Sequence, residues 1–342
     1  MTTEPTTDHT TSLHDTATEL VNDRRGILAA DESIGTMDKR LEKAGVDPTE
    51  ENRRAYRELL VTTPDLHAGI SGVILCDETL RQQLGDGRTF PRALSDLGML
   101  PGIKVDTGAK PLAGAPGEKV TEGLDGLSDR LEEYVELGAR FAKWRAVITI
   151  GDGTPTDWAQ QANAHALARY ARACQDAGLV PIVEPEVLMD GAHSQERCAE
   201  VTAATLRMLF RMLTDAGFDP RGTVLKPNMV VPGTDSGQDA GPDEVARVTV
   251  DTLRSTLPDE LAGVAFLSGG QSSETATANL KAMQEVDSPW PLTFSFGRAL
   301  VSPALQEWQG DPDRIAEGQS ALAHQVTCNA EVLRERSALR IA

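Results

Sequence analysis

Cysteine and histidine are both scarce in this chain of 342 residues. The four cysteines are Cys76, Cys174, Cys198 and Cys328, and no two of them form a C-x-x-C pair. This spacing argues against a disulfide framework or a structural zinc site and predicts a protein of the reducing cytoplasm. The six histidines include no H-E-x-x-H motif and no cluster with the spacing of metal ligands, so we expect no metal site.

The chain also lacks long apolar runs and an excess of positive charge. No stretch of about 18 apolar residues is present, which argues against a membrane span, and the N-terminal segment lacks the basic and apolar regions of a signal peptide. The net charge of −19 argues against a nucleic-acid or acidic-membrane partner, because the field of the protein repels polyanions. Since the acidic residues are scattered, they predict a solubilising surface, and tolerance of high salt is a hypothesis.

Lysine is the rarer basic residue, because only eight of the 33 Lys and Arg residues are lysines. Three of the eight, Lys104, Lys143 and Lys226, nevertheless lie inside apolar, strand-like segments. Burying an ammonium group costs free energy unless the group is paired or loses its proton. Taken singly, Lys226 is better explained as a snorkelling or ion-paired side chain than as a catalytic group.

Eight short apolar runs recur along the chain and alternate with segments of helical periodicity. The runs cover residues 25–33, 71–78, 101–106, 141–150, 179–187, 223–231, 263–270 and 291–297. Strands that alternate with amphipathic helices predict a parallel sheet, and eight such units close a barrel. No G-x-G-x-x-G motif follows the first strand, which makes a dinucleotide-binding sheet the weaker choice. We predict an α/β fold, a single-domain (β/α)8 TIM barrel over residues 19–342 with C-terminal helices, after a flexible Thr-rich tail over residues 1–18.

Charged residues gather at the predicted C-terminal ends of the strands, where such barrels carry their active sites. They are Asp31 and Glu32 in the first run, Lys104 and Asp106 in the third, Lys143 and Arg145 in the fourth, Glu184 and Glu186 in the fifth, Lys226 in the sixth, and Arg298 after the eighth. Lysines that converge with carboxylates suit covalent catalysis, in which a neutral amine attacks a carbonyl to form a Schiff base and carboxylates carry protons. Neighbouring cations and an apolar setting favour the neutral amine that this chemistry needs.

The seventh run ends in Leu267-Ser268-Gly269-Gly270 and leads into a predicted helix. Glycines there allow backbone N–H groups to approach an anion, and a helix N-terminus adds partial positive charge. Loops after the last two strands of a barrel often bind phosphate, and Arg298 can add a bidentate contact. The S-G-G motif alone is not specific, but its place at the barrel end indicates a phosphate site.

Nine short motifs occur in an order and spacing that resemble class I fructose-1,6-bisphosphate aldolase. They are ILAADES, GIKVD, PLAG, GLDGL, FAKWR, IVEPE, LKPNM, FLSGGQS and FSFGRAL, and the match runs over residues 25–308. The resemblance implies a (β/α)8 barrel, a cytoplasmic homotetramer without metal or other cofactor, and sugar phosphates as small-molecule partners. It also implies a lyase of glycolysis and gluconeogenesis that reversibly cleaves fructose 1,6-bisphosphate into dihydroxyacetone phosphate and glyceraldehyde 3-phosphate through a lysine Schiff base.

The resemblance implies a role for each matching residue. Lys226 would form the Schiff base, Glu184 would help to expel water, and Asp31 would handle the proton of the C4 hydroxyl. Glu186 and Lys143 would form a charged pair that polarises the site. The C6 phosphate would be held by Lys104, Ser33 and Thr36 with Arg145 and Arg40 nearby, and the C1 phosphate by Leu267, Ser268, Gly269, Gly270, Gly297 and Arg298 with Ser295 beside them.

Two features differ from the pattern of many relatives. Many animal members end in a tail with a terminal tyrosine that assists proton exchange on the enamine, whereas this chain ends in Arg340-Ile341-Ala342. We therefore expect another proton carrier or a slower enamine step. Phe296 stands where a tyrosine is common, which predicts a small effect.

Three other functions are weaker predictions. Another lysine-dependent barrel lyase, transaldolase-like or acting on keto acids, needs one phosphate site, whereas this sequence offers candidates for two. A non-catalytic scaffold would lack Lys226, Glu184 or Asp31, and all three are present. A zinc-dependent aldolase would need clustered histidines. The preference between the bisphosphate and fructose 1-phosphate, and the direction of the reaction, stay open.

Overall fold

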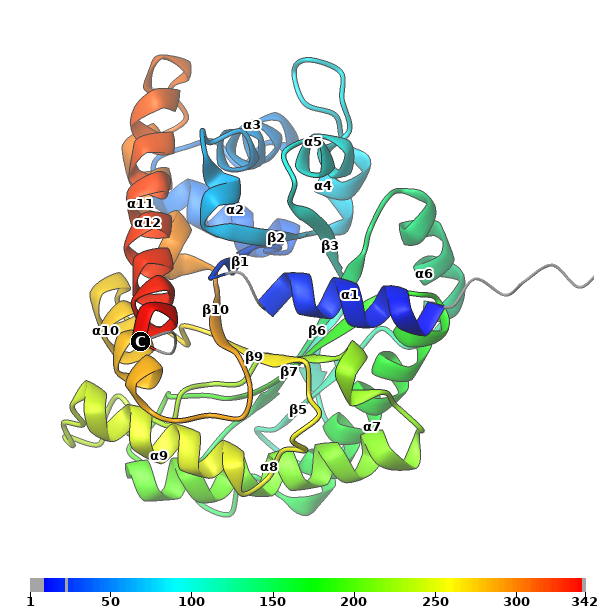
Figure 1. The fold of residues 1–342 in the computed structure, drawn as a ribbon, viewed down its shortest axis with the longest axis vertical. Helices are drawn as coiled ribbons and strands as arrows, with labels where there is room; N and C mark the ends of the chain where they lie inside the picture. Colours follow the sequence, from blue (N-terminus) through cyan, green and yellow to red (C-terminus); the bar gives the residue numbers. More distant parts are fainter. Residues whose placement is uncertain (1–8, 22–23, 340–342) are drawn as a thin grey trace, which may run out of the picture.

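The computed structural model describes residues 9–21 and 24–339, and within them eight parallel strands form a closed barrel (Figure 1). In sequence order the barrel strands are β1 (Gly26–Ala30), β2 (Ile70–Leu75), β3 (Leu100–Lys104), β6 (Phe141–Ile148), β7 (Val180–Val187), β8 (Val224–Leu225), β9 (Gly263–Phe266) and β10 (Leu292–Phe296). Pairing of β10 with β1 closes the ring. Each strand overlaps one of the eight apolar runs, and the predicted (β/α)8 barrel is confirmed.

Helices surround the barrel and follow the segments of helical periodicity. They are α2 (Ile34–Lys43), α3 (Glu50–Val61), α4 (Asp77–Arg81), α5 (Phe90–Asp96), α6 (Leu127–Glu136), α7 (Asp157–Asp176), α8 (Gln195–Asp215), α9 (Pro242–Arg254), α10 (Ser273–Glu285), α11 (Arg298–Trp308) and α12 (Ile315–Leu339), with 3-10 turns η1 (Leu66–Ala68), η2 (Pro220–Gly222) and η3 (Pro312–Arg314). The side chains of Thr49, Thr156, Ser194 and Ser272 each accept a hydrogen bond from a backbone N–H of the first turn, which explains why helices begin there. The predicted C-terminal helices are present as α11 and α12.

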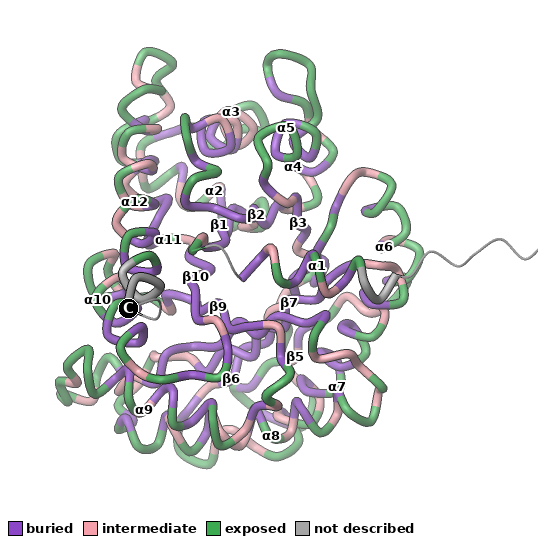
Figure 2. The backbone as a smooth tube through the Cα atoms, in the orientation of Figure 1, coloured by how far each residue is buried: buried purple, intermediate pink, exposed green. Residues whose placement is uncertain are grey.

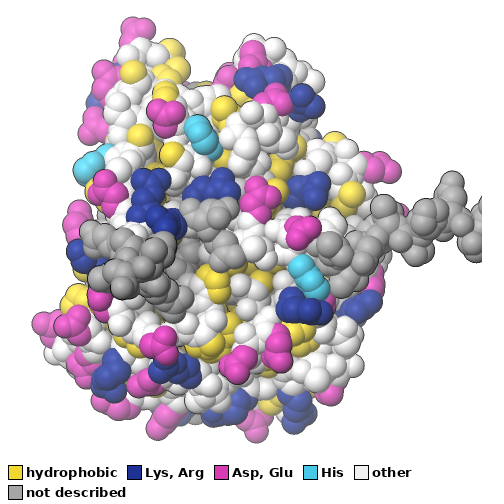
Figure 3. All heavy atoms as spheres, viewed as in Figure 1, with side chains coloured by type: hydrophobic (Ala, Val, Ile, Leu, Met, Phe, Trp, Pro, Cys, Tyr) yellow, Lys and Arg dark blue, Asp and Glu magenta, His cyan; other side chains and the backbone are white. Residues whose placement is uncertain are grey.

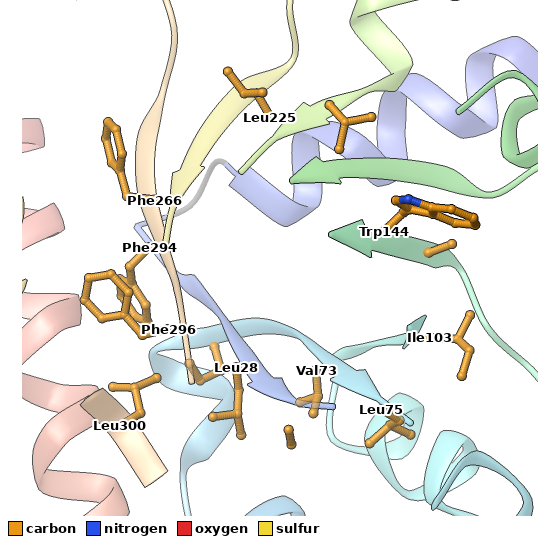
Figure 4. Close-up of a cluster of buried hydrophobic side chains, with 14 of the residues drawn as sticks. Leu28, Val73, Leu75, Ile103, Trp144, Leu225, Phe266, Phe294, Phe296 and Leu300 are labelled. Carbon is orange, nitrogen blue, oxygen red and sulfur yellow. The ribbon is translucent and has the colours of Figure 1, made fainter. Parts of the chain in front are cut away.

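Apolar side chains fill the space between the strands and the helices. Figure 2 shows that the strands are almost wholly buried, whereas each helix has a buried and an exposed side. Side chains alternate along a strand, so Leu28 of β1 packs outward against the helices while Ile27 and Ala29 face the barrel interior. Trp144 and Phe294 are also fully buried in the outer cluster (Figure 4). This two-sided burial explains why the strands read as continuous apolar runs.

A two-stranded antiparallel hairpin follows β3 and was not predicted. Its strands are β4 (Gly108–Pro111) and β5 (Lys119–Glu122), with Gly108 opposite Glu122. The sequence here is rich in Gly and Pro and lacks the alternation of apolar residues that indicates a strand. Because it extends directly from β3, the hairpin lies at the end of the barrel where the strands end.

Helix α1 (His9–Val21) corrects the prediction of a flexible tail over residues 1–18, because residues 9–18 belong to it, while residues 1–8 lie outside the described residues. Leu13, Ala17 and Leu20 are buried against side chains of the barrel interior. They recur at helical spacing, a pattern that the many threonines of this segment obscured.

Helix α1 covers the end of the barrel opposite the C-terminal strand ends (Figure 1). Two strand glycines make room for it. A Cβ atom at Gly263 would lie 2.7 Å from Val21, and one at Gly72 would lie 2.9 Å from Leu20. Helix α1 therefore packs tightly onto the strands and closes this end of the barrel.

We expect Leu20→Ala to lower the free energy of unfolding by about 2–5 kcal/mol, because the side chain is fully buried between α1 and the barrel. Urea unfolding measures this change. Leu97→Ala, at a side chain that is 41% exposed, is the matched control and should change the stability by less than about 0.5 kcal/mol. Equal stabilities of the two variants would show that α1 does not pack onto the barrel.

Acidic and basic side chains are interspersed on the face shown in Figure 3, as the scattered charges of the sequence predicted. Within the described ranges, no helix combines the length and apolarity that a membrane crossing requires.

Candidate active site

The C-terminal ends of the strands surround a cavity of about 820 Å³. A parallel barrel brings all these ends to one face, so side chains far apart in the sequence meet there. The cavity is lined by all the predicted site residues except Gly270, namely Asp31, Ser33, Thr36, Arg40, Lys104, Lys143, Arg145, Glu184, Glu186, Lys226, Leu267, Ser268, Gly269, Ser295, Gly297 and Arg298.

Lys226 directly follows β8, which ends at Leu225 although the apolar run continues to Val231. The backbone N–H of Lys226 still donates to the carbonyl of Val183 on β7 at 2.8 Å. The next residue, Pro227, has no N–H to donate, so the ladder ends. The sequence thus places the lysine directly after the last residue of the strand, where its side chain enters the cavity and is 5% exposed.

Four charged side chains form a continuous row across the cavity floor. The Lys143 ammonium lies 2.6 Å from Oδ2 of Asp31 and 3.3 Å from Oε2 of Glu184. The other carboxylate oxygen of Glu184 lies 3.2 Å from Nζ of Lys226. Oε2 of Glu184 accepts no hydrogen bond from the described residues. Glu184 therefore lies between two ammonium groups and has its Oε1 next to the nucleophile candidate.

The charges in this row hold one another ionised despite burial. Burial raises the pKa of Asp31, but the Lys143 and Lys226 charges outweigh it and keep that pKa well below its usual range. Burial likewise raises the pKa of Glu184, and Lys143 and Lys226 again lower it below its ordinary value. Burial lowers the pKa of Lys143, whereas Asp31 and Glu184 raise it above its ordinary value. Both carboxyl groups are therefore carboxylates at neutral pH, and Lys143 is an ammonium.

The predicted charged pair of Glu186 with Lys143 is corrected, since Glu186 pairs with Arg145 at 2.5 Å. The register of β6 against β7 explains why the ion-pair partners differ from the prediction. Lys143 lies opposite Ile182 and Arg145 lies opposite Glu184, so each cation reaches the carboxylate two residues further along β7. Lys143 thereby meets Glu184, and Arg145 meets Glu186.

One end of the cavity is built by α2, β3 and the hairpin. Ser33 and Thr36 share a hydrogen bond of 3.0 Å at the start of α2. The predicted phosphate-binding cations here are held by carboxylates. Lys104 lies 2.7 Å from Asp106, Arg145 pairs with Glu186, and Arg40 pairs with Glu32.

Three lysines of this end were missed by the sequence analysis. Lys39, Lys43 and Lys110 line the cavity, so six of the eight lysines of the chain lie around it. The spacing of Lys39 and Lys43 on one helix that follows the first strand was a usable signal. Lys110 could not be placed without the hairpin.

The other end of the cavity is built by the segments that follow β9 and β10. Gly269 and Gly270 have φ angles of +49° and +86°, a backbone conformation that glycine adopts without strain. Gly270 itself does not line the cavity, but a Cβ atom there would lie 3.7 Å from the Arg298 guanidinium. Ser295 is 1% exposed, and its hydroxyl has no hydrogen-bond partner among the described residues. This end offers backbone N–H groups, a hydroxyl and a guanidinium to an anion.

Among the described residues, no group of three or more His, Cys, Asp and Glu side chains could hold a metal ion. The reactive groups of the cavity are a lysine amine, adjacent carboxylates and cationic groups at both ends. They define an enzyme class that forms a Schiff base with a phosphorylated carbonyl compound.

Comparison with known proteins identifies the family. Residues 12–338 match the family model of fructose-bisphosphate aldolase class-I. A probable fructose-bisphosphate aldolase class 1 of Xylella fastidiosa is 56% identical over 315 residues, which is 92% of this chain and 93% of that protein. The cytosolic fructose-bisphosphate aldolase 4 of Arabidopsis thaliana is 50% identical over 309 residues, 90% of this chain and 79% of that protein. A crystal structure of fructose-bisphosphate aldolase from Plasmodium falciparum, in complex with TRAP and a small-molecule inhibitor, superposes with a TM-score of 0.93 at 44% identity and covers 95% of each chain.

The chain therefore belongs to the class I fructose-bisphosphate aldolase family. Members of this family are lyases of glycolysis that act through a lysine Schiff base, and the family binds sugar phosphates. The resemblance drawn from the nine motifs is confirmed.

Proposed function

We propose that this chain reversibly cleaves D-fructose 1,6-bisphosphate into dihydroxyacetone phosphate and D-glyceraldehyde 3-phosphate through a Schiff base on Lys226. The observation that carries the proposal is the contact of 3.2 Å between Nζ of Lys226 and Oε1 of Glu184 inside the cavity. A buried amine beside a carboxylate has a proton acceptor at hand and can become the neutral nucleophile.

Schiff-base formation needs protons to move at the lysine nitrogen and at the departing oxygen. Because Glu184 begins as a carboxylate, it can take a proton from the Lys226 ammonium, and the neutral amine then bonds to C2 of the ketose. Glu184 gives this proton to the C2 oxygen, which becomes a hydroxyl. Glu184 next takes a second proton from the nitrogen bonded to C2 and gives it to the hydroxyl, which leaves as water, and the iminium forms. The carboxyl oxygen Oε1, which lies 3.2 Å from Nζ of Lys226, is the one placed to exchange these protons.

Cleavage needs a base at the C4 hydroxyl. Asp31 is a carboxylate on the far side of Lys143 from Glu184. It takes the C4 hydroxyl proton, the C3–C4 bond breaks, and the electron pair moves into the iminium to give an enamine and the aldehyde product. Proton addition at C3 and hydrolysis then release dihydroxyacetone phosphate. Lys143 stays charged throughout and stabilises both carboxylates.

The two ends of the cavity suit the two phosphates. Ser33, Thr36, Lys104, Arg40 and Arg145 would hold the C6 phosphate. Leu267, Ser268, Gly269, Gly270, Ser295, Gly297 and Arg298 would hold the C1 phosphate. To bind phosphate, the paired cations Lys104, Arg40 and Arg145 must share or exchange their carboxylate partners. Glu186 would then act by holding Arg145.

We also propose a cytoplasmic homotetramer. The support is the resemblance to the family and the cytosolic names of the plant relatives. Sedimentation of the purified protein measures the assembly, and a monomer would contradict this part of the proposal.

The direct test of the Schiff base is reduction by borohydride in the presence of dihydroxyacetone phosphate, followed by peptide mapping by mass spectrometry. We expect one stable adduct, on the peptide that contains Lys226. Borohydride reduction without the ketone is the control. An adduct on another lysine, or none, would contradict the proposed mechanism.

A further inference from the structure

Cationic side chains outnumber carboxylates around the cavity, and the proposed mechanism does not use the additional cations. Among the described residues, five carboxylates line the cavity, and each is paired with a cation. The pairs are Asp31 with Lys143, Glu184 with Lys226, Asp106 with Lys104, Glu32 with Arg40, and Glu186 with Arg145. No carboxylate of the cavity wall in the described ranges is therefore left without a cationic partner.

Four cations of the cavity wall are left over. Lys39, Lys43, Lys110 and Arg298 line the cavity, and none of the four forms an ion pair with any residue in the described ranges. A sugar phosphate group carries about −1.5 to −2 charges at neutral pH. In a protein of net charge −19, four unpaired cations around one cavity match the charge of a bisphosphate.

The four unpaired cations are distributed unevenly between the two ends of the cavity. Arg298 follows β10, at the end proposed for the C1 phosphate. The other three belong to the opposite end: Lys39 and Lys43 lie one turn apart on α2, and Lys110 lies on β4 of the hairpin. All three are exposed, whereas Lys104, Lys143 and Lys226 are buried or half-buried. The cavity thus has an inner set of paired lysines and an outer set of unpaired ones.

We propose that Lys43 and Lys110, together with Lys39, form an outer phosphate subsite that receives the C6 phosphate of the ketose bisphosphate and sets the preference for the bisphosphate over fructose 1-phosphate. These lysines bind an anion without giving up a carboxylate, whereas Lys104, Arg40 and Arg145 must break or share an ion pair. The outer subsite therefore attracts the phosphate first and adds to its binding thereafter. This inference rests on the proposed aldolase function.

The test compares two substrates that differ only in the distal phosphate. In the double variant Lys43→Gln/Lys110→Gln, we expect kcat/KM for fructose 1,6-bisphosphate to fall about tenfold, as for the loss of two exposed ion pairs. The kcat value should change less than about twofold, and kcat/KM for fructose 1-phosphate should stay within about twofold, because that substrate places no phosphate at this end. Lys119→Gln is the matched control, since Lys119 is exposed on β5 of the same hairpin and is not part of the cavity wall.

Two results would overturn the outer subsite. An equal fall for both substrates would mean that the lysines act only through net charge, and no fall would mean that they do not contact substrate. Borohydride trapping of dihydroxyacetone phosphate, run on the wild type and the double variant, separates this failure from that of the proposed function. A wild type that traps no ketone overturns the Schiff-base function and the subsite with it, whereas normal trapping with an unchanged substrate ratio overturns the subsite alone.

Discussion

Replacement of Lys226 by arginine is expected to lower kcat/KM for fructose 1,6-bisphosphate by about 10⁴-fold or more, the scale seen when a catalytic unit loses its nucleophile. A guanidinium keeps its proton at any working pH and cannot attack a carbonyl. Because arginine keeps the positive charge beside Glu184, the change removes the nucleophile without stripping that carboxylate of its partner. Steady-state kinetics measures the loss, and borohydride trapping should give no adduct.

The matched control is Lys119→Arg, at an exposed position on β5, which should leave kcat/KM within about twofold of the wild type. Activity of Lys226→Arg within tenfold of the wild type would contradict the assignment of the nucleophile. A ketone adduct that persists on another lysine of the variant would contradict it as well.

The sequence sufficed to predict the barrel because each strand is buried on both faces. Two-sided burial makes each strand a short apolar run, and eight such runs at regular intervals leave few other architectures. The features of the fold that the sequence did not predict have local causes. Pro227 ends β8 early, the Gly- and Pro-rich hairpin has no apolar pattern, and the threonines of α1 obscure the spacing of Leu13, Ala17 and Leu20.

The sequence was sufficient to predict which residues form the site, but not which cation pairs with which carboxylate. Alternation along a strand shows that Glu184 and Glu186 share a face, and the parallel barrel brings them to the same end as Lys143 and Arg145. Which cation meets which carboxylate depends on the register of β6 against β7, and a single sequence carries no direct signal of register. The resemblance implied a pair of Lys143 with Glu186, whereas the structure pairs Lys143 with Glu184.

The register of β6 against β7 explains how a lysine can lie inside an apolar strand. Lys143 is 3% exposed yet lies between two carboxylates, so its burial is offset by two close ion pairs. The same contacts keep Asp31 and Glu184 ionised in a buried setting. Lys143, together with Lys226, thus maintains the charge states that both proton-transfer steps require.

Lys143→Met is accordingly expected to lower both stability and activity. It leaves Asp31 and Glu184 buried without their shared cation, which should cost about 3–5 kcal/mol of unfolding free energy at neutral pH. Loss of the fixed charge beside both proton carriers should also lower kcat by about 10³-fold. Lys143→Arg is the control, because it keeps the charge. It should regain most of the stability but little of the activity, since a planar fork cannot occupy the position of an ammonium between two strands.

The loss of unfolding free energy expected for Lys143→Met depends on pH. In the wild type, the lowered pKa values of Asp31 and Glu184 contribute stability above their unfolded values of about 4, and the contribution is lost only as the pH falls through the lower folded values. In Lys143→Met, burial remains and the cation is gone, so the folded pKa of Asp31 should rise above its unfolded value. A raised carboxyl pKa removes stability as the pH rises. The gap in unfolding free energy between variant and wild type should therefore widen from about pH 4 to about pH 7. Urea unfolding across this range measures the gap. A gap that is constant with pH would mean that Lys143 acts by packing alone and does not set the charge of Asp31.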